Sequence, residues 1–190
     1  RHTYYGLTLD TFNDRIMLFG GARWQDGGAL QSMDSYNIGS NSYSPQGTHP
    51  TMPSSNHAFF AADPATGNVY VVFNDFNFRR WNRATNTWSQ PAAGGPVPPG
   101  GLYMAAATDT TRNRILFAGG SSSARHFYDI ATNTFTQITF TGPNAGSATG
   151  MTQAALLYVP ALDRFLFRTS GAGGTVFQIH PTTFEVTTVA

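Results

Sequence analysis

The sequence predicts an all-β fold made of four successive four-stranded antiparallel sheets. An apolar strand that ends in a glycine pair occurs twice, as Arg15–Gly21 and as Arg114–Gly120. Two aromatic residues seven positions apart follow each of these strands, and the same spacing recurs in the other two segments of the chain. The pairs are Tyr36/Tyr43, Trp81/Trp88, Tyr128/Phe135 and Phe177/Phe184. The chain therefore contains four copies of one strand-turn-strand repeat.

Each copy begins with a short apolar strand and a tight turn. We expect the first strands at Tyr5–Asp10, His57–Asp63, Tyr103–Asp109 and Ala154–Val159. The turns that follow are rich in Asn, Asp, Gly and Pro, the residues that favour tight reversals. They are Thr11–Asp14, Pro64–Gly67, Thr110–Asn113 and Pro160–Asp163.

The second strand of each copy is almost continuously apolar, which is typical of a sheet covered on both faces. These strands are Arg15–Phe19, Asn68–Phe73, Arg114–Ala118 and Arg164–Arg168, and they start 46 to 53 residues apart. This spacing suits a four-stranded propeller blade, and no segment has the 3.6-residue period of a helix. We therefore expect a β-propeller domain over residues 1–190 with almost no helix and with repeats at about 4–45, 57–90, 102–138 and 152–189.

The composition excludes several classes of protein. Hydrophobic residues make up 41% of the 190 residues, which is typical of a packed globular domain. The net charge is +1 and the chain has no Lys, so we expect neither nucleic-acid binding nor attraction to an anionic membrane. No apolar run is long enough to span a membrane. Cys is absent, which excludes disulfides and thiolate metal sites. The few charges and many Thr, Asn and Gly favour a secreted or cell-surface bacterial-type protein, and the initial Arg1 suggests processing.

The repeats resemble those of the kelch-type β-propellers, which include the central domain of galactose oxidase. The resemblance rests on the glycine pairs, on the Tyr128-Asp129 and Tyr36-Asn37 steps, and on the Thr-Asn-Thr-Trp segment that ends at Trp88. Copies two and four depart from it because Asn74-Asp75 and Thr169-Ser170 replace the glycine pair. The radical copper chemistry of galactose oxidase depends on a Tyr crosslinked to a Cys, so that activity is not expected here.

Rings of the kelch type usually hold more than four blades, and this chain supplies no strand that would join its first blade to its last. Three arrangements remain open. The four blades form a compact ring, further blades complete the ring, or two chains pair into a larger ring. An open arrangement would expose sheet faces and edges that soluble proteins usually cover.

Candidate ligand-binding residues are those that break the repeat. The connection after the second strand of the first copy is longer than elsewhere and carries Arg23, Trp24 and Asp26, which offer an aromatic face with polar flanks. The equivalent region of the second copy carries Asp75 and Arg79, and that of the third carries Arg125. Each of these residues also has a structural interpretation, in blade packing or in a surface ion pair.

No catalytic motif is present, so we expect no catalytic residue, no cofactor and no metal. The only Glu is Glu185, and most Asp residues mark the recurring turn. The five histidines fall in different segments without a metal-ligand spacing; they are His2, His49, His57, His126 and His180. The leading hypothesis is a non-catalytic binding or structural module whose loops contact a protein partner or an extracellular glycan. The alternative is the propeller part of a secreted carbohydrate-active enzyme or oxidase with its catalytic residues outside this chain. Self-association is a third possibility.

Overall fold

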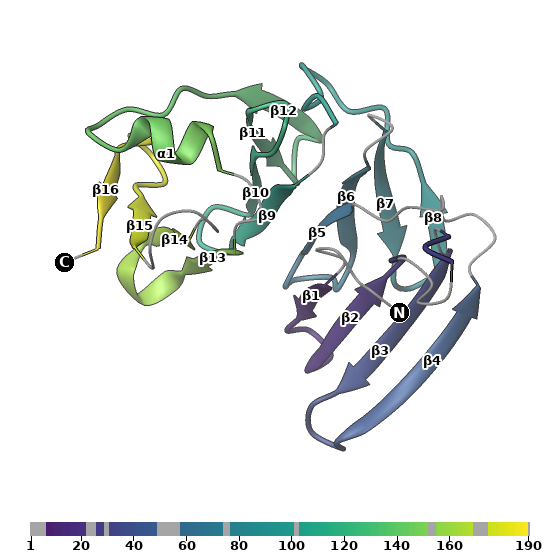
Figure 1. Cartoon of the computed structure of the whole chain (residues 1–190). Coiled ribbons are helices and arrows are strands. Elements are labelled where there is room, and N and C mark those ends of the chain that lie inside the picture. Colours follow the sequence, from purple (N-terminus) through teal and green to yellow (C-terminus); the bar gives the residue numbers. More distant parts are fainter. Residues whose placement is uncertain are drawn as a thin grey trace. The chain divides into compact units, whose positions relative to one another are not determined.

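The computed structural model describes residues 7–21, 26–28, 31–48, 58–73, 77–100, 103–151, 155–168 and 175–189. In this part of the chain it confirms the all-β prediction, with four antiparallel four-stranded sheets, each built from consecutive strands (Figure 1). This is the blade architecture of a β-propeller.

Blade 1 holds β1 (Leu7–Asp10), β2 (Arg15–Phe19), β3 (Ser32–Asn37) and β4 (Ser42–Thr48). Blade 2 holds β5 (Ala58–Ala62), β6 (Val69–Phe73), β7 (Phe78–Asn82) and β8 (Thr87–Ser89). Blade 3 holds β9 (Met104–Asp109), β10 (Arg114–Gly119), β11 (Ala124–Asp129) and β12 (Thr134–Gln137). Blade 4 holds β13 (Ala155–Val159), β14 (Arg164–Arg168), β15 (Val176–Ile179) and β16 (Val186–Thr188).

The chain forms two compact units, each with two blades. Unit 1 spans residues 1–91 and holds blades 1 and 2, and unit 2 spans residues 92–190 and holds blades 3 and 4. In each unit the innermost strands of the two blades are neighbours, β1 with β5 and β9 with β13. In the described residues the only α-helix is the short α1 (Ala145–Thr149), and no helix there is long and apolar enough to span a membrane.

The turn between the first and second strands is built in the same way in three blades. Asp10 and Asp109 end their first strands, and Asp63 directly follows β5. The three side chains are buried, and each accepts a hydrogen bond from the backbone N–H two residues later. These aspartates are thus turn-formers, as predicted. The last turn residue has a positive φ in all four blades, at Asp14, Gly67, Asn113 and Asp163.

Three of the four aromatic pairs are confirmed as cross-strand partners between the third and fourth strands. They are Tyr36/Tyr43, Trp81/Trp88 and Tyr128/Phe135. The polar end of each first aromatic residue also donates a hydrogen bond to the Asn side chain in the hairpin turn, from Tyr36 to Asn41, from Trp81 to Asn86 and from Tyr128 to Asn133. The aromatic pair and its turn therefore form one unit of structure.

The fourth aromatic pair does not face across the sheet. Phe177 faces Thr188 across the sheet, whereas Ile179 and Val186 are cross-strand partners at the register that the aromatic pairs occupy in blades 1 to 3. Phe184 precedes β16 with a φ of 59°. The seven-residue spacing is therefore kept in blade 4, but it belongs to two aliphatic residues that lie two positions later in the sequence.

The glycine pairs take the positive φ that the sequence predicts for them. Gly119 and Gly120 have φ values of 76° and 77°. A Cβ atom at Gly119 would lie 2.2 Å from the carbonyl oxygen of Met151, and the backbone N–H of Gly120 donates to that same oxygen at 2.6 Å. Glycine is thus required at this strand end, because the chain that leads into blade 4 passes against it.

In unit 2, the segment that precedes each blade hydrogen-bonds to the outermost strand of that same blade. Gly94 forms a parallel bridge with Thr134 of β12, and Thr141 forms one with Glu185 next to β16. A Gly-Pro step follows in both segments, Gly95-Pro96 and Gly142-Pro143. These segments cover backbone groups at the outer edge of the blade, where an unpaired strand would otherwise be open to other chains.

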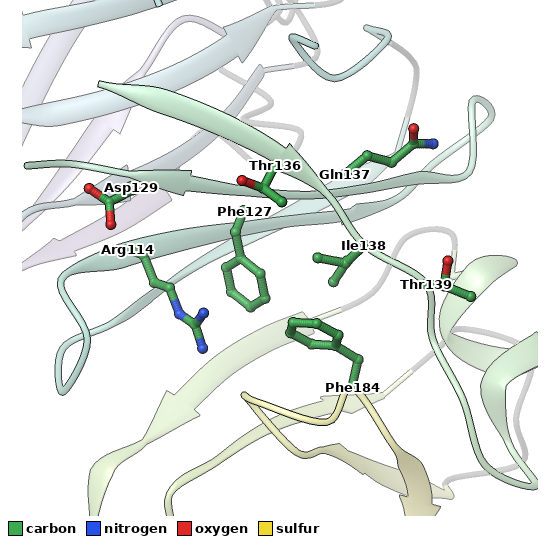
Figure 2. A pocket seen from close by; sticks show the side chains of 8 residues that line it. All are labelled: Arg114, Phe127, Asp129, Thr136, Gln137, Ile138, Thr139 and Phe184. Atoms are coloured by element: carbon green, nitrogen blue, oxygen red, sulfur yellow. The ribbon is translucent and has the colours of Figure 1, made fainter. Parts of the chain in front are cut away.

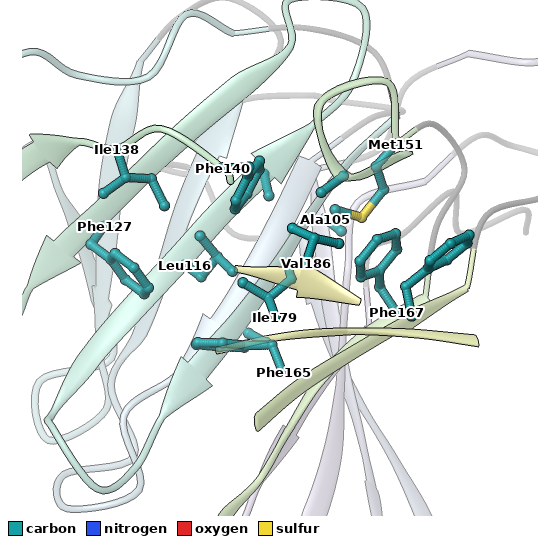
Figure 3. Close-up of a cluster of buried hydrophobic side chains, with 14 residues drawn as sticks. Ala105, Leu116, Phe127, Ile138, Phe140, Met151, Phe165, Phe167, Ile179 and Val186 are labelled. Carbon is teal, nitrogen blue, oxygen red and sulfur yellow. The ribbon is translucent and has the colours of Figure 1, made fainter. Parts of the chain in front are cut away.

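Each unit has its own hydrophobic core between its two blades. In unit 1, Phe19 of blade 1 stacks on Phe60 of blade 2 with a centroid distance of 4.4 Å, and Trp88 meets Phe19 edge-on. In unit 2, Leu116 and Phe127 of blade 3 are buried with Phe165 and Ile179 of blade 4 (Figure 3). Blade packing, rather than turn chemistry alone, therefore holds each pair of sheets together.

Candidate functional site

The candidate site is a pocket of about 430 Å³ in unit 2, on the face of blade 3 that packs against blade 4 (Figure 2). Its walls come from the outer strands of blade 3, the segment that leaves β12, and the turn before β16. The lining residues are Arg114, Phe127, Asp129, Thr136, Gln137, Ile138, Thr139 and Phe184. The volume lies in the range of pockets that hold small molecules.

Two aromatic rings and one aliphatic side chain form the apolar part of the pocket. Phe127 is 4% exposed and Ile138 is 6% exposed, so both are fixed by the core. The ring of Phe184 lies 5.5 Å from that of Phe127, at 39°. Phe184 itself is only partly buried and belongs to a turn, so its ring is the more accessible of the two.

Arg114 places a fixed positive charge beside this apolar wall. Its Cζ lies 4.2 Å from the centroid of the Phe127 ring, its Nε donates to Asp109 at 3.2 Å, and its Nη2 donates to the carbonyl oxygen of Pro181 at 2.6 Å. The guanidinium is thereby held by a carboxylate, a carbonyl and a ring. Within the described residues its Nη1 makes no hydrogen bond and can donate to a ligand.

The rest of the rim is polar and uncharged apart from Asp129. Asp129 Oδ1 accepts hydrogen bonds from the backbone and hydroxyl of Thr132, which fixes the carboxylate at the end of β11. The hydroxyls of Thr136 and Thr139 make no hydrogen bond within the described part of the chain. Thr136 faces Phe127 across the sheet, whereas Gln137 follows it on the opposite face of β12. The pocket therefore offers donors and acceptors around an aromatic floor.

Of the six residues predicted to bind a ligand, Arg23, Trp24 and Asp75 lie outside the described residues. Asp26 lies in the connection between β2 and β3 and is exposed, and its Oδ1 accepts a hydrogen bond from the backbone N–H of Gly28 at 2.9 Å. The three that are described, Asp26, Arg79 and Arg125, do not line the pocket. Their role in binding stays a prediction.

Arg79 and Arg125 are described, and they belong to different units. Arg79 lies in β7 of blade 2 and Arg125 in β11 of blade 3. The Nε of each is buried and has no hydrogen-bond partner. Each side chain is only partly buried as a whole. Both arginines are thus partly covered by their blades, and their role in ligand binding stays a prediction.

The two histidines in the described residues have structural surroundings. The Nδ1 of His180 accepts hydrogen bonds from the backbone N–H groups of Thr182 and Thr183, which caps the turn before β16. Burial, and secondarily the positive charge of Arg125, lowers the pKa of His126 below its ordinary value. Among the described residues, no three His, Cys, Asp or Glu side chains gather as metal ligands.

Sequence reasoning missed this pocket for a specific reason. The seven-residue spacing groups Phe184 with the repeated aromatic residues, which indicates a packing role. His180 takes the turn-capping place that Asn37, Asn82 and Asp129 hold in the other blades, so it marks the residue before it, Ile179, as the cross-strand partner. Phe184 therefore does not occupy a position of the repeated aromatic pairs, which is expected of a residue in a ligand-binding site.

No protein-family model matches the chain, and no curated protein matches its sequence.

Proposed function

We propose that this protein is a non-catalytic binding module that holds a neutral, hydroxyl-rich ligand, a sugar residue of a glycan, in the pocket of unit 2. The observation that supports the proposal is the partly buried ring of Phe184 beside a rim of hydrogen-bonding groups, Arg114 Nη1, Thr136 and Thr139. A sugar ring presents C–H groups that pack on an aromatic face and hydroxyls that pair with such a rim. The opposite charges of Arg114 and Asp129 favour a neutral ligand over a strongly anionic or cationic one.

The kelch-type assignment is part of this proposal. The glycine pairs with positive φ and the aromatic pairs with their turn Asn residues support it, because the same residues carry the resemblance in the sequence. A secreted or cell-surface location, proposed from composition, would give such a module access to extracellular glycans.

The proposal excludes catalysis in this pocket on chemical grounds. Among the described residues that line the pocket, Asp129 is the only carboxylate. Hydrolysis of a glycosidic bond generally requires two carboxyl groups on either side of that bond. The pocket can therefore hold a sugar without cleaving it.

Isothermal titration calorimetry with a panel of neutral mono- and oligosaccharides tests the proposal. We expect saturable binding that Phe184→Ala weakens at least about fivefold, because the variant removes the accessible ring. Phe12→Ala is the matched control, since Phe12 is a turn phenylalanine of unit 1 with 47% exposure. Absence of binding across the panel, or equal binding by Phe184→Ala, would contradict the proposal. Cleavage of a sugar polymer by the chain would favour the enzyme hypothesis instead.

A further inference from the structure

The two terminal blades expose sheet faces whose repeat equivalents are buried inside the units. On blade 1, Leu7 and Leu9 are 51% and 52% exposed, and Tyr43 on the same face is 56% exposed. On blade 4, Leu157 is 50% exposed and Val176 is 37% exposed. Apolar side chains gathered on one face in this way indicate a surface that binds another protein surface.

The blade contact inside unit 1 shows which kind of surface fits the blade 1 face. The register places Leu7, Tyr36 and Tyr43 of blade 1 at the positions of Phe60, Trp81 and Trp88 of blade 2. In blade 2 these three residues are 4%, 3% and 8% exposed. They surround the ring of Phe19, which comes from the preceding blade. The blade 1 face therefore has the form of a surface that receives one central side chain from another blade.

Blade 4 carries a different side chain at the position of Phe19. The register of β13 and β14 matches that of β1 and β2, and it aligns Arg168 with Phe19. Arg168 is exposed, and it lies on the same face as Leu157 and Leu166. An arginine replaces the phenylalanine at the centre of this face.

The blade 1 face differs from its blade 2 counterpart in a way that complements this arginine. Tyrosines 36 and 43 replace the two tryptophans, and Asp34 stands where blade 2 has Arg79. Asp34 is 6% exposed and its Oδ2 accepts a hydrogen bond from the hydroxyl of Tyr43 at 2.6 Å, so the buried carboxylate orients the exposed tyrosine ring. A guanidinium that docks on this face meets two aromatic rings, which are preferred partners of arginine.

We infer that the blade 4 face of one copy of this chain docks on the blade 1 face of a second copy, with Arg168 against the rings of Tyr36 and Tyr43 of that copy. The contact is head-to-tail, so it joins copies into a closed ring or an open row, according to the rotation between them. It uses sheet faces and leaves the rim pocket of unit 2 out of the contact, so it does not depend on the proposed function.

Complementation between two variants tests the inference. Arg168→Glu is designed to disable the blade 4 face, and Leu9→Arg is designed to disable the blade 1 face, because its positive charge repels Arg168. In light scattering coupled to size exclusion, over a wide range of concentration, wild type is expected to reach at least twice its 20.5 kDa mass. Each variant alone is expected to associate at least about tenfold more weakly. An equal mixture is expected to form one-to-one pairs, because the intact face of one variant meets the intact face of the other.

Leu162→Asp is the control, because Leu162 is 57% exposed in the turn between β13 and β14. It should associate like wild type, and circular dichroism should show that all three variants are folded. Wild type that remains monomeric at every concentration would overturn the inference, and so would variants that associate as wild type does. A mixture that associates no better than its two components would also overturn it, because association would then use other surfaces.

Discussion

Arg112 of blade 3 and Asp163 of blade 4 form a bidentate ion pair. Arg112 Nη1 donates to Asp163 Oδ1 and Nη2 donates to Oδ2, each at 2.7 Å. The two residues lie in the turns between the first and second strands of their blades. The Tyr158 hydroxyl also donates to Asp163, and Arg112 contacts Asp109 as well. The pair therefore joins the two blades of unit 2 at a place that the hydrophobic core does not reach.

The first prediction concerns the acid stability of this contact. The hydrogen bonds from Arg112, and then the one from Tyr158, hold the pKa of Asp163 well below its ordinary value. The unfolded chain then binds this proton at a higher pH than the folded chain does, so the stabilisation is present above about pH 4 and is lost as the pH falls below it. We expect Asp163→Asn to be less stable than wild type at neutral pH and to lose less stability on acidification. Chemical denaturation at a series of pH values measures both effects.

Asp14→Asn is the control for this experiment. Asp14 occupies the equivalent turn position of blade 1, also with a positive φ. It has no arginine partner among the described residues. The pH dependence of Asp14→Asn should follow that of wild type. If Asp163→Asn showed the wild-type pH dependence too, the Arg112 contact would not set the acid stability.

The second prediction concerns the glycine pair of blade 3. Gly119→Ala places a methyl group 2.2 Å from the carbonyl oxygen of Met151 and on a residue with a φ of 76°. Because backbone must move, we expect a loss of at least about 2 kcal/mol in the free energy of unfolding. In Gly146→Ala the new methyl group meets nothing within 4 Å, and the residue lies in α1. That variant should be neutral or slightly more stable. Equal effects of the two substitutions in urea denaturation would show that the close approach at Gly119 is unimportant.

The third prediction concerns the aromatic-to-turn hydrogen bond of blade 3. Tyr128→Phe removes the hydroxyl that donates to Asn133 Oδ1 at 2.8 Å and keeps the buried ring. We expect a loss of about 1 kcal/mol in the free energy of unfolding, with no change in secondary structure. Phe135→Leu, on the facing strand, tests the packing of the pair separately. A Tyr128→Phe variant as stable as wild type would show that the hydroxyl does not stabilise the turn.

The fourth prediction concerns the rim of the pocket. Thr136→Val keeps the shape of the side chain and removes the hydroxyl that faces the pocket. We expect a threefold to tenfold loss of saccharide affinity, roughly the worth of one hydrogen bond, and unchanged thermal stability. Thr132→Val is unsuitable as a control because Thr132 hydrogen-bonds Asp129, so Thr85→Val in unit 1 serves instead. If Thr136→Val bound saccharide with the affinity of wild type, the Thr136 hydroxyl would not be a contact of the ligand.

The order and spacing of the strands could be predicted from the sequence, because each turn depends on a few local residues. Asp at the end of the first strand and a residue with positive φ at the end of the turn fix the first hairpin without help from distant contacts. The register of blade 4 could not be predicted in the same way. The turn before β16 has the same length as its equivalents, but the partners seven residues apart are Ile179 and Val186 rather than the aromatic pair two positions earlier, and only cross-strand pairing reveals this.

The candidate site was harder to predict than the fold. Arg79 and Arg125 are charged residues that break the repeat, which made them candidates for ligand binding. Their side chains are partly covered by their blades. The pocket instead combines Arg114 and Phe127 from blade 3 with Phe184 from the next blade. Such a site depends on how two sheets pack, and a pattern within one repeat does not report it.

The bridges of Gly94 with Thr134 and of Thr141 with Glu185 have a consequence for how this chain can be divided and copied. Each bridge pairs the linker before a blade with the outermost strand of that blade. In unit 2, a blade and its preceding linker are therefore held together by their own residues. The natural module for duplication or transplantation then starts just before the Gly-Pro step, at Ala92 and at Thr141, and not at the first strand of the blade. A gene cut before Ala92 and before Thr141 would keep the bridging residues with the strand that they cover, whereas one cut at Met104 and Ala155 would leave the outer strand without them.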